Sequence, residues 1–345
     1  MKSNSIKAFA FSIAVLGAAN GFGQTQAVTD PVGFVSVTVP ANSDAVLAVP
    51  MNRASVYKGV INSISGTTIT VAGISPAWGN NQFVQALPTQ INTYAVQFAS
   101  GVKEGMIGKV TGNTANTFTI SLESGDDLTG VKSETVDGAG LGDHIDIMPY
   151  WTPLSVLGST VPVNTQILNF DLVGAGVNNA ATGSYGFDGA NWVNEDSFDF
   201  ADHTPLYFGK AFILRNNNGS PLTASIVGAV PMSKHRILLR TLVGGGVDQD
   251  VRIGFSSPVP QTVGSIGLGF SEDDQLLVFN NASTGKNKAP SQTLFYTVAD
   301  GWVDDGFTPV GTTFMIQPGQ GYVFRKKGTA SPTTIVWTSL QSYLQ

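Results

Sequence analysis

Apolar and polar residues alternate with a period of two along much of the chain. In residues 34–39 three valines alternate with Ser36 and Thr38, and residues 67–71 and 117–122 follow the same pattern. Such alternation is typical of strands in antiparallel sheets with one buried face. Turn-forming pairs separate the alternating segments: Ser65-Gly66, Gly112-Asn113, Asp188-Gly189, Asn218-Gly219 and Asp300-Gly301. No helical period is found after residue 23, so the pattern predicts an all-β protein built from antiparallel β-sandwich or barrel modules.

The C-terminal two thirds of the chain contain an internal duplication. The segment Gly-Lys-Ala-Phe-Ile-Leu-Arg at 209–215 matches Gly-Gln-Gly-Tyr-Val-Phe-Arg at 319–325, and Trp192 stands at the same offset from Trp302. Two further pairs of segments keep nearly the same spacing: residues 166–170 with 275–279, and residues 226–227 with 335–336. A nearly constant offset over four segments predicts two copies of one domain-sized β module with the same topology.

The residues before the duplication have a different pattern of alternating segments. Alternating segments at 94–98, 105–110, 118–122 and 145–148 predict a compact meander, a small barrel or sandwich, with an insertion around 126–142. A weaker pattern, Trp78 followed by Tyr94, leaves a degenerate third copy as an alternative.

We therefore expect three folded units. They are an N-terminal β domain at 24–150, a first module at 151–231 and a second module at 232–345.

The first residues have the features of a secretory signal. Lys2 and Lys7 precede a largely apolar run at 8–19, and small residues follow this run. The pattern predicts a signal peptide at 1–23, cleaved after Gly23 or Ala27, with a structural N-terminal helix as the alternative. The apolar run is shorter than the roughly 20 residues that a membrane-spanning helix needs. We expect an exported protein without a transmembrane helix, located in the periplasm, on the outer surface or outside the cell.

Composition narrows the classes of partner and of chemistry. Charged residues make up 12% of the chain, about half of the usual share, and the formal net charge is −6. A weakly acidic chain is a poor partner for nucleic acid or anionic lipid, both of which bind basic surfaces. The chain has no cysteine, which excludes disulfides, zinc–thiolate sites and iron–sulfur clusters.

The segment Thr-Asp-Pro-Val-Gly-Phe-Val-Ser-Val at 29–37 resembles the mature start of a family of uncharacterised exported all-β proteins found mainly in Verrucomicrobia. Residues 112–117, 126–131, 149–152 and 318–322 are also similar to that family. The family has no established activity, so the resemblance implies export and an all-β architecture and leaves the ligand open.

Few residues have the spacing that catalysis requires. The three histidines, His144, His203 and His235, are far apart in the sequence, and no Gly-x-Ser-x-Gly elbow is present. These features argue against nucleophile–base catalysis and against a histidine zinc site. A pair of carboxylates for glycoside hydrolysis need not be close in sequence, so a polysaccharide-acting enzyme remains a weaker alternative. We expect no enzyme activity.

Two groups of acidic residues are candidates for binding calcium, which prefers several oxygen ligands. The first group follows two of the tryptophans: Glu195, Asp196, Asp199, Asp202, Asp304 and Asp305. The second group surrounds the expected insertion: Asp126, Asp127, Asp137, Asp143 and Asp146. Neither has the spacing of a known calcium loop, so we favour solvated turn residues and keep Ca²⁺ as the alternative.

Trp78, Trp192 and Trp302 each follow a turn of small or acidic residues. They could form an aromatic surface that stacks on sugars, or they could fill the cores of the modules. We favour the core for Trp192 and Trp302, because a duplicated module repeats its packing. We also expect Arg215 and Arg325 to lie on equivalent strand faces.

The leading functional hypothesis is a non-catalytic exported protein, a structural component of the cell surface or extracellular matrix, that acts through the surfaces of its β modules. The alternative is a carbohydrate-binding or adhesive module. The expected partners are accordingly polysaccharide or further copies of the same chain.

Overall fold

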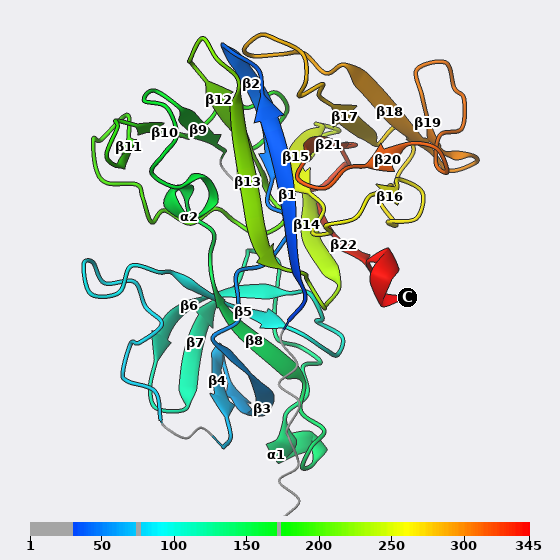
Figure 1. The fold of residues 1–345 in the computed structure, drawn as a ribbon. Helices are drawn as coiled ribbons and strands as arrows, with labels where there is room; N and C mark the ends of the chain where they lie inside the picture. Colours follow the sequence, from blue (N-terminus) through cyan, green and yellow to red (C-terminus); the bar gives the residue numbers. More distant parts are fainter. Residues whose placement is uncertain (1–29, 74–76, 171–173) are drawn as a thin grey trace, which may run out of the picture. The chain divides into compact units, whose positions relative to one another are not determined.

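The structure is a computed structural model that describes residues 30–73, 77–170 and 174–345. The predicted signal peptide at 1–23 lies outside these residues. Strands dominate, as the alternating pattern predicts, and the helical elements are short: α1 (Glu134–Asp137), α2 (Pro153–Leu157) and the 3-10 helix η1 (Ser342–Leu344) (Figure 1). Among the described residues, no helix has the length and apolar character needed to cross a membrane.

Six antiparallel strands close a barrel in the order β3-β4-β7-β6-β5-β8. They are β3 (Tyr57–Ser65), β4 (Thr68–Val71), β5 (Tyr94–Phe98), β6 (Ile107–Asn113), β7 (Thr117–Ser121) and β8 (His144–Pro149). Alternation sends Phe118 and Ile120 of β7 into the buried core, whereas Thr117 and Thr119 are only half-buried. The helix α1 lies in the insertion between β7 and β8 that the sequence predicts.

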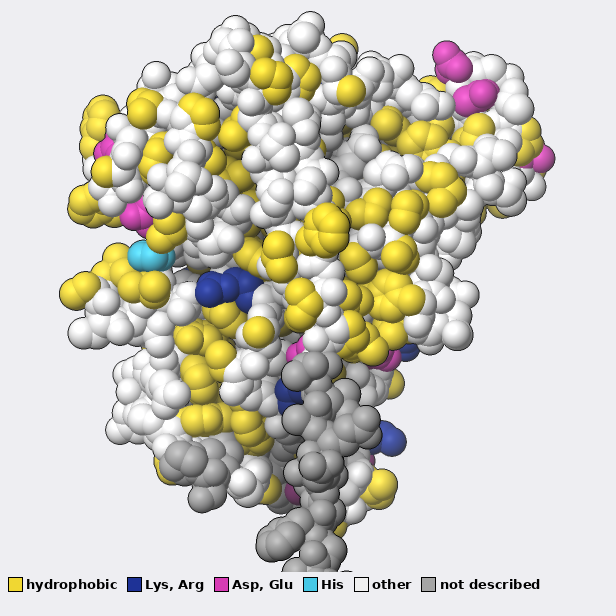
Figure 2. Space-filling model, viewed as in Figure 1, with side chains coloured by type: hydrophobic (Ala, Val, Ile, Leu, Met, Phe, Trp, Pro, Cys, Tyr) yellow, Lys and Arg dark blue, Asp and Glu magenta, His cyan; other side chains and the backbone are white. Residues whose placement is uncertain are grey.

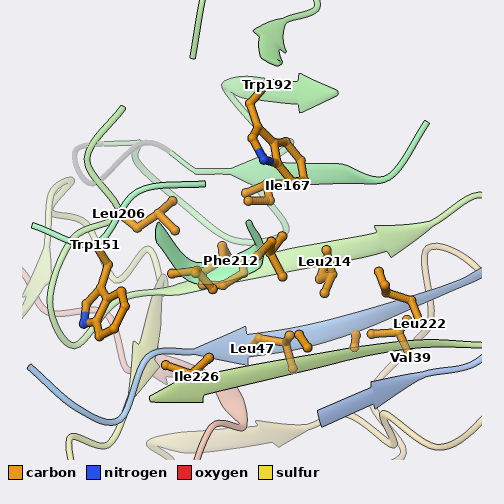
Figure 3. Close-up of a cluster of buried hydrophobic side chains, with 14 of the residues drawn as sticks. Val39, Leu47, Trp151, Ile167, Trp192, Leu206, Phe212, Leu214, Leu222 and Ile226 are labelled. Atoms are coloured by element: carbon orange, nitrogen blue, oxygen red, sulfur yellow. The ribbon is translucent and has the colours of Figure 1, made fainter. Parts of the chain in front are cut away.

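The first module contains a five-stranded sheet, in the order β11-β10-β9-β12-β2, and a separate antiparallel pair, β1-β13. Its strands are β1 (Val32–Val39), β2 (Ser43–Ala48), β9 (Gln166–Asn169), β10 (Gly183–Phe187), β11 (Trp192–Asn194), β12 (Ala211–Asn216) and β13 (Leu222–Ala229). A hydrophobic core that includes Leu47, Ile167, Phe212, Leu214 and Ile226 joins the sheet to the strand pair (Figure 3).

The second module repeats this arrangement. Its five-stranded sheet has the order β15-β21-β17-β18-β19, and the pair β14-β22 takes the place of β1-β13. Its strands are β14 (His235–Thr241), β15 (Gln249–Gly254), β17 (Gln275–Val278), β18 (Gln292–Thr297), β19 (Gly301–Val303), β21 (Gly321–Lys326) and β22 (Thr333–Ser339), with a further pair, β16 (Gln261–Thr262) and β20 (Met315–Ile316). The internal duplication is therefore confirmed at the level of strand order.

The strand pairing corrects the expected division at residue 150. β1 pairs along its whole length with β13, and β2 pairs with β12, so residues 32–48 belong to the first module. Val39 and Leu47 are buried in that module's core, which the segment 151–231 could not close alone. The barrel is thus an insertion between β2 and α2 of the first module. Its closed six-stranded order differs from that of the modules, so the alternative of a degenerate third copy is wrong.

The two repeated tryptophans fill equivalent places in the two cores. Trp192 is 0% exposed and Trp302 is 1% exposed. Each indole nitrogen donates to a backbone carbonyl, Trp192 to Gly158 O at 3.1 Å and Trp302 to Leu268 O at 2.8 Å. Figure 3 shows Trp192 above Ile167, on the sheet that also carries Phe212. The prediction that both tryptophans serve packing is confirmed.

Candidate functional site

The acidic residues near the tryptophans act mainly on nearby backbone. Asp202 Oδ1 accepts a hydrogen bond from Trp192 N at 2.8 Å, and Asp304 Oδ1 accepts from the amides of Gly306 and Thr308. Glu195 accepts from the side chains of neighbouring strands, whereas Asp196, Asp199 and Asp305 are exposed. In the described part of the chain, no three metal-ligating side chains come together in one group. Calcium binding by these residues stays an untested alternative.

The second acidic group is dispersed over separate partners. Asp126 pairs with Arg236, Asp127 with Lys103 at 2.8 Å, and Asp146 with Lys58 at 3.5 Å. The remaining two carboxylates accept backbone hydrogen bonds, Asp137 from Ser133 N and Asp143 from Lys132 N. These contacts give each of the five carboxylates a structural partner.

His235 is buried inside the second module. Its ring is 4.5 Å from the ring of Trp337 and 5.0 Å from that of Phe255, and Nδ1 lies 3.1 Å from Ser256 Oγ. Burial lowers its pKa to about 3, and the positive charge of Lys210 acts in the same direction. The imidazole is therefore neutral over the physiological pH range.

The three tryptophans do not form a shared sugar-stacking surface. Trp192 and Trp302 are buried in separate cores, and Trp78 is half-buried at the barrel. The Trp78 ring packs edge-on against Tyr57, at 4.9 Å, and against Phe83, at 5.1 Å.

The two modules meet where the pair β2-β12 contacts the pair β15-β21. Glycine permits the close approach on both sides. A Cβ atom on Gly254 would lie 1.9 Å from Ala48 Cβ, and one on Gly321 would lie 2.6 Å from Ala211 Cβ. The backbones bond across this contact, through Ala48 N to Gly319 O at 3.0 Å and Gly254 N to Gly209 O at 2.9 Å.

Each module covers the edge strand of the other. Asp44 N on β2 donates to Gly285 O at 3.0 Å, and Asp250 N on β15 donates to Gly176 O at 2.9 Å. Gly285 and Gly176 lie in equivalent loops, β17–β18 and β9–β10. Exposed edge strands present unpaired amides and carbonyls, so this exchange of loops satisfies both edges at once. The contact is reciprocal, like the self-complementary interface of a two-fold dimer.

Two ion pairs repeat the same reciprocity. Arg215 binds Asp44 through Nε and Nη2, at 2.8 and 2.9 Å, and Arg325 binds Asp250 through the same atoms, at 2.8 and 3.1 Å. An asparagine of the opposite module completes each group. Asn287 N donates to Asp44 and its Oδ1 accepts from Arg215, while Asn178 does the same for Asp250 and Arg325. The carboxylates raise the pKa of both arginines through these hydrogen bonds.

Beyond the glycine contact, a groove of about 710 Å³ opens between the modules. Its walls are largely apolar, with Leu168 and Ile213 from the first module and Leu277 and Val323 from the second. Three cations and two carboxylates also line it: Arg215, Arg252, Lys288, Asp44 and Asp250. A mostly apolar groove of this size with a few polar groups has the properties of a ligand-binding site.

A second cavity, of about 240 Å³, lies where the barrel meets both modules, with Tyr207, Phe208 and Lys210 from the first module among its lining residues. Charged groups of its lining form ion pairs, Glu123 with Lys210 and Asp126 with Arg236, and Glu123 also pairs with Arg240 outside the lining. Burial lowers the pKa of Lys210, and the charge of Glu123 partly offsets this effect. This cavity is best explained by the packing of the inserted barrel against both modules.

The sequence did not point to the groove. The repeat aligned Arg215 with Arg325, but their partners Asp44 and Asp250 are separated by the inserted barrel and fall outside the constant offset. Arg252 and Lys288 belong to no motif. A comparison of residues 43–48 with residues 249–254, each of which has an aspartate in second place, could have found the two aspartates.

None of the protein-family models matches the chain, and neither a curated protein nor a solved structure is significantly similar to it.

Proposed function

We propose that this chain is a non-catalytic exported protein, a structural component of the cell surface or extracellular matrix that acts through the surfaces of its β modules. The observation that carries the proposal is the reciprocal contact between the modules. Each loop completes the edge strand of the other module, and two bidentate ion pairs reinforce the contact. This arrangement joins two sheets into one continuous unit and supports a load-bearing or scaffolding role.

The charged groups of the groove support a non-catalytic role. A general acid or base must exchange a proton with its substrate. Asp44 and Asp250 are 3% and 7% exposed, and each accepts two hydrogen bonds from an arginine and one from a backbone amide. Carboxylates held in this way offer little exposed surface to a substrate. The face shown in Figure 2 carries few charged side chains, in keeping with contacts to uncharged polymers or surfaces.

Cell fractionation and an activity screen together test this proposal. We expect the mature chain in the exported fraction, with an intact mass that corresponds to a start between residues 20 and 28. We expect the purified protein to release no reducing ends from a panel of polysaccharides. Two results would contradict the proposal. One is a protein in the cytosolic fraction that still carries Met1, and the other is a release of sugar that the Asp44→Asn variant abolishes.

Carbohydrate binding is the second candidate function, and the groove favours it. The groove is open at loops whose residues Asn178, Ala180, Asn287 and Ala289 are exposed, so an extended chain could enter without a change of fold. Electrophoresis in gels that contain soluble polysaccharides tests this function. Retardation by at least one polysaccharide supports it, and unchanged mobility in all of them contradicts it.

A further inference from the structure

We propose that the groove between the modules binds an acidic polysaccharide, a chain that carries carboxylates on its sugar rings, and that Arg252 and Lys288 are the residues that bind these carboxylates. The inference rests on the second candidate function, carbohydrate binding in the groove, and specifies the class of polysaccharide.

Arg252 and Lys288 differ in their partners from the two arginines of the reciprocal ion pairs. Arg215 and Arg325 each bind an aspartate, whereas Arg252 and Lys288 form no ion pair with the residues that the structure describes. Arg252 lies with its guanidinium carbon 3.5 Å from the centre of the Phe170 ring, and its Nη2 donates to Asn179 O at 2.8 Å. A guanidinium has five N–H donors, and within the described residues only the bond to Asn179 O uses one of them, so the others remain for a ligand.

The ammonium group of Lys288 is held by its own loop. Its Nζ donates to Asn280 O at 2.7 Å and to Ser283 O at 3.0 Å, which leaves one of its three donors for a ligand. Lys288 is one of the residues that line the groove, and these bonds fix the position of its ammonium group. Two cations with free donors therefore line one groove.

Burial makes both cations favourable partners for an anion. It lowers the pKa of Arg252 to about 10, and it lowers the pKa of Lys288, although a neighbouring aspartate opposes the effect in each case. Neutral carbonyl groups and an aromatic ring offset only part of the cost of removing hydration from these two charges. A bound carboxylate would offset this cost through charge-assisted hydrogen bonds.

The two cations belong to different parts of the reciprocal contact. Arg252 lies on β15 and contacts Asn179 in the β9–β10 loop, whereas Lys288 lies in the β17–β18 loop and interacts with Asp44 on β2. Each cation therefore adds a positive charge beside one of the two arginine–aspartate pairs. Glu195 and Asp248 also act on these arginines, but neither lines the groove. Positive charge beside both pairs suits a polymer with repeated carboxylates.

The walls of the groove suit sugar rings. Leu168, Ile213, Leu277 and Val323 offer apolar surface to the C–H faces of pyranose rings, and Phe279 adds an aromatic side chain. Asn178 and Asn287 use their Oδ1 atoms to accept from arginines, which directs their amide groups to other partners such as sugar hydroxyls.

The experiment compares two forms of one polymer with the full-length protein. Polygalacturonate carries the carboxylates, and its methyl ester has the same backbone without charge. We expect polygalacturonate to bind more tightly than the ester, and the binding to weaken as salt is added. Arg252→Gln and Lys288→Gln should each weaken binding by about tenfold, because each removes a hydrogen bond between charged groups.

Two controls separate binding from folding. Lys286→Gln removes the same charge from the same loop, but Lys286 is exposed and does not line the groove, so binding should be unchanged. Arg252→Lys keeps the positive charge and should retain more affinity than Arg252→Gln. The melting temperature of each variant shows whether the fold is intact.

The outcomes distinguish the inference from carbohydrate binding itself. Equal binding of polygalacturonate and its ester, insensitive to both glutamine variants, would overturn the acidic-ligand inference and preserve carbohydrate binding. Absence of binding to any polysaccharide would overturn both. Binding of decanoate that depends on Arg252, without binding of polygalacturonate, would reassign the groove to a small amphipathic acid and overturn the inference.

Discussion

Arg215 lies directly opposite Asp44 in the antiparallel pair of β12 and β2, and its guanidinium binds both oxygens of that carboxylate. Arg325 and Asp250 repeat this relationship in the pair of β21 and β15. The duplication has therefore preserved a contact between strands as well as a strand order. Because each pair also binds an asparagine of the other module, the two ion pairs connect packing within a module to contact between modules.

The first prediction concerns removal of one arginine. Arg215→Met leaves Asp44, which is largely buried, without its cationic partner. Breaking a buried ion pair in this way is strongly destabilising, and because Arg215 is partly exposed we expect about 3 kcal/mol, at the low end of the usual range. Urea unfolding measures the change, and Arg325→Met should give a similar one. The double variant Asp44→Asn with Arg215→Met should recover much of the loss, and failure to recover would contradict the assigned pairing.

The second prediction concerns the glycines at the contact between the modules. Gly254→Ala would place a Cβ atom against Ala48 Cβ, so the two modules would have to separate. Overpacking of this kind costs about 1–3 kcal/mol in the free energy of unfolding. Gly219→Ala is the matched control, because no atom lies within 4 Å of the added Cβ. If Gly254→Ala were as stable as Gly219→Ala, the close approach of the modules would be wrong.

Much of the fold could be predicted from the sequence because its signals are local. The expected strand at 94–98 coincides with β5, and the expected strand at 117–122 contains β7. The duplication was visible because β9, β12 and β13 keep their spacing to β17, β21 and β22. Each of these signals depends on residues that are close in the chain or regularly repeated.

The rest of the fold depends on contacts between distant residues. Asp44 and Asp250 are 206 residues apart, whereas Arg215 and Arg325 are 110 apart, because the barrel is inserted only in the first module. Because of the insertion, the sequence did not show that β1 and β2 belong to the first module. For the same reason it did not show the groove that β2 helps to form. The acidic turns fit the pattern of calcium ligands because aspartate is common both in turns and at metal sites.

The third prediction concerns the two core tryptophans. Trp192→Ala and Trp302→Ala would each remove a fully buried indole and leave its backbone acceptor without the N–H donor. Such truncations cost about 3–5 kcal/mol. Trp78→Ala is the comparison, since this half-buried ring should cost less when it is removed. Differential scanning calorimetry would measure all three variants, and a ranking that placed Trp78→Ala first would contradict the assignment of the cores.

The last prediction concerns the pH dependence of stability. In the unfolded chain His235 takes up a proton as the pH falls through about 6.5. In the folded protein burial and the charge of Lys210 lower its pKa to about 3, so the native state takes up that proton only near pH 3. Between these values the unfolded state binds more protons, and His235 therefore lowers stability as the pH falls, by up to about 1.4 kcal/mol per unit. Above pH 6.5 it contributes no pH dependence.

Urea unfolding between about pH 5 and pH 7 tests this relationship, because most carboxylates titrate at lower pH. His235→Gln removes the titrating group and should flatten the pH dependence in that range, whatever its effect on stability at neutral pH. His144→Gln is the matched control, because it removes the same chemical group from an exposed position at the start of β8. Since the variants remove the same chemical group from different environments, only burial distinguishes them. An equal slope in the wild type and in His235→Gln would mean that water reaches the imidazole and that the core around Trp337 is open.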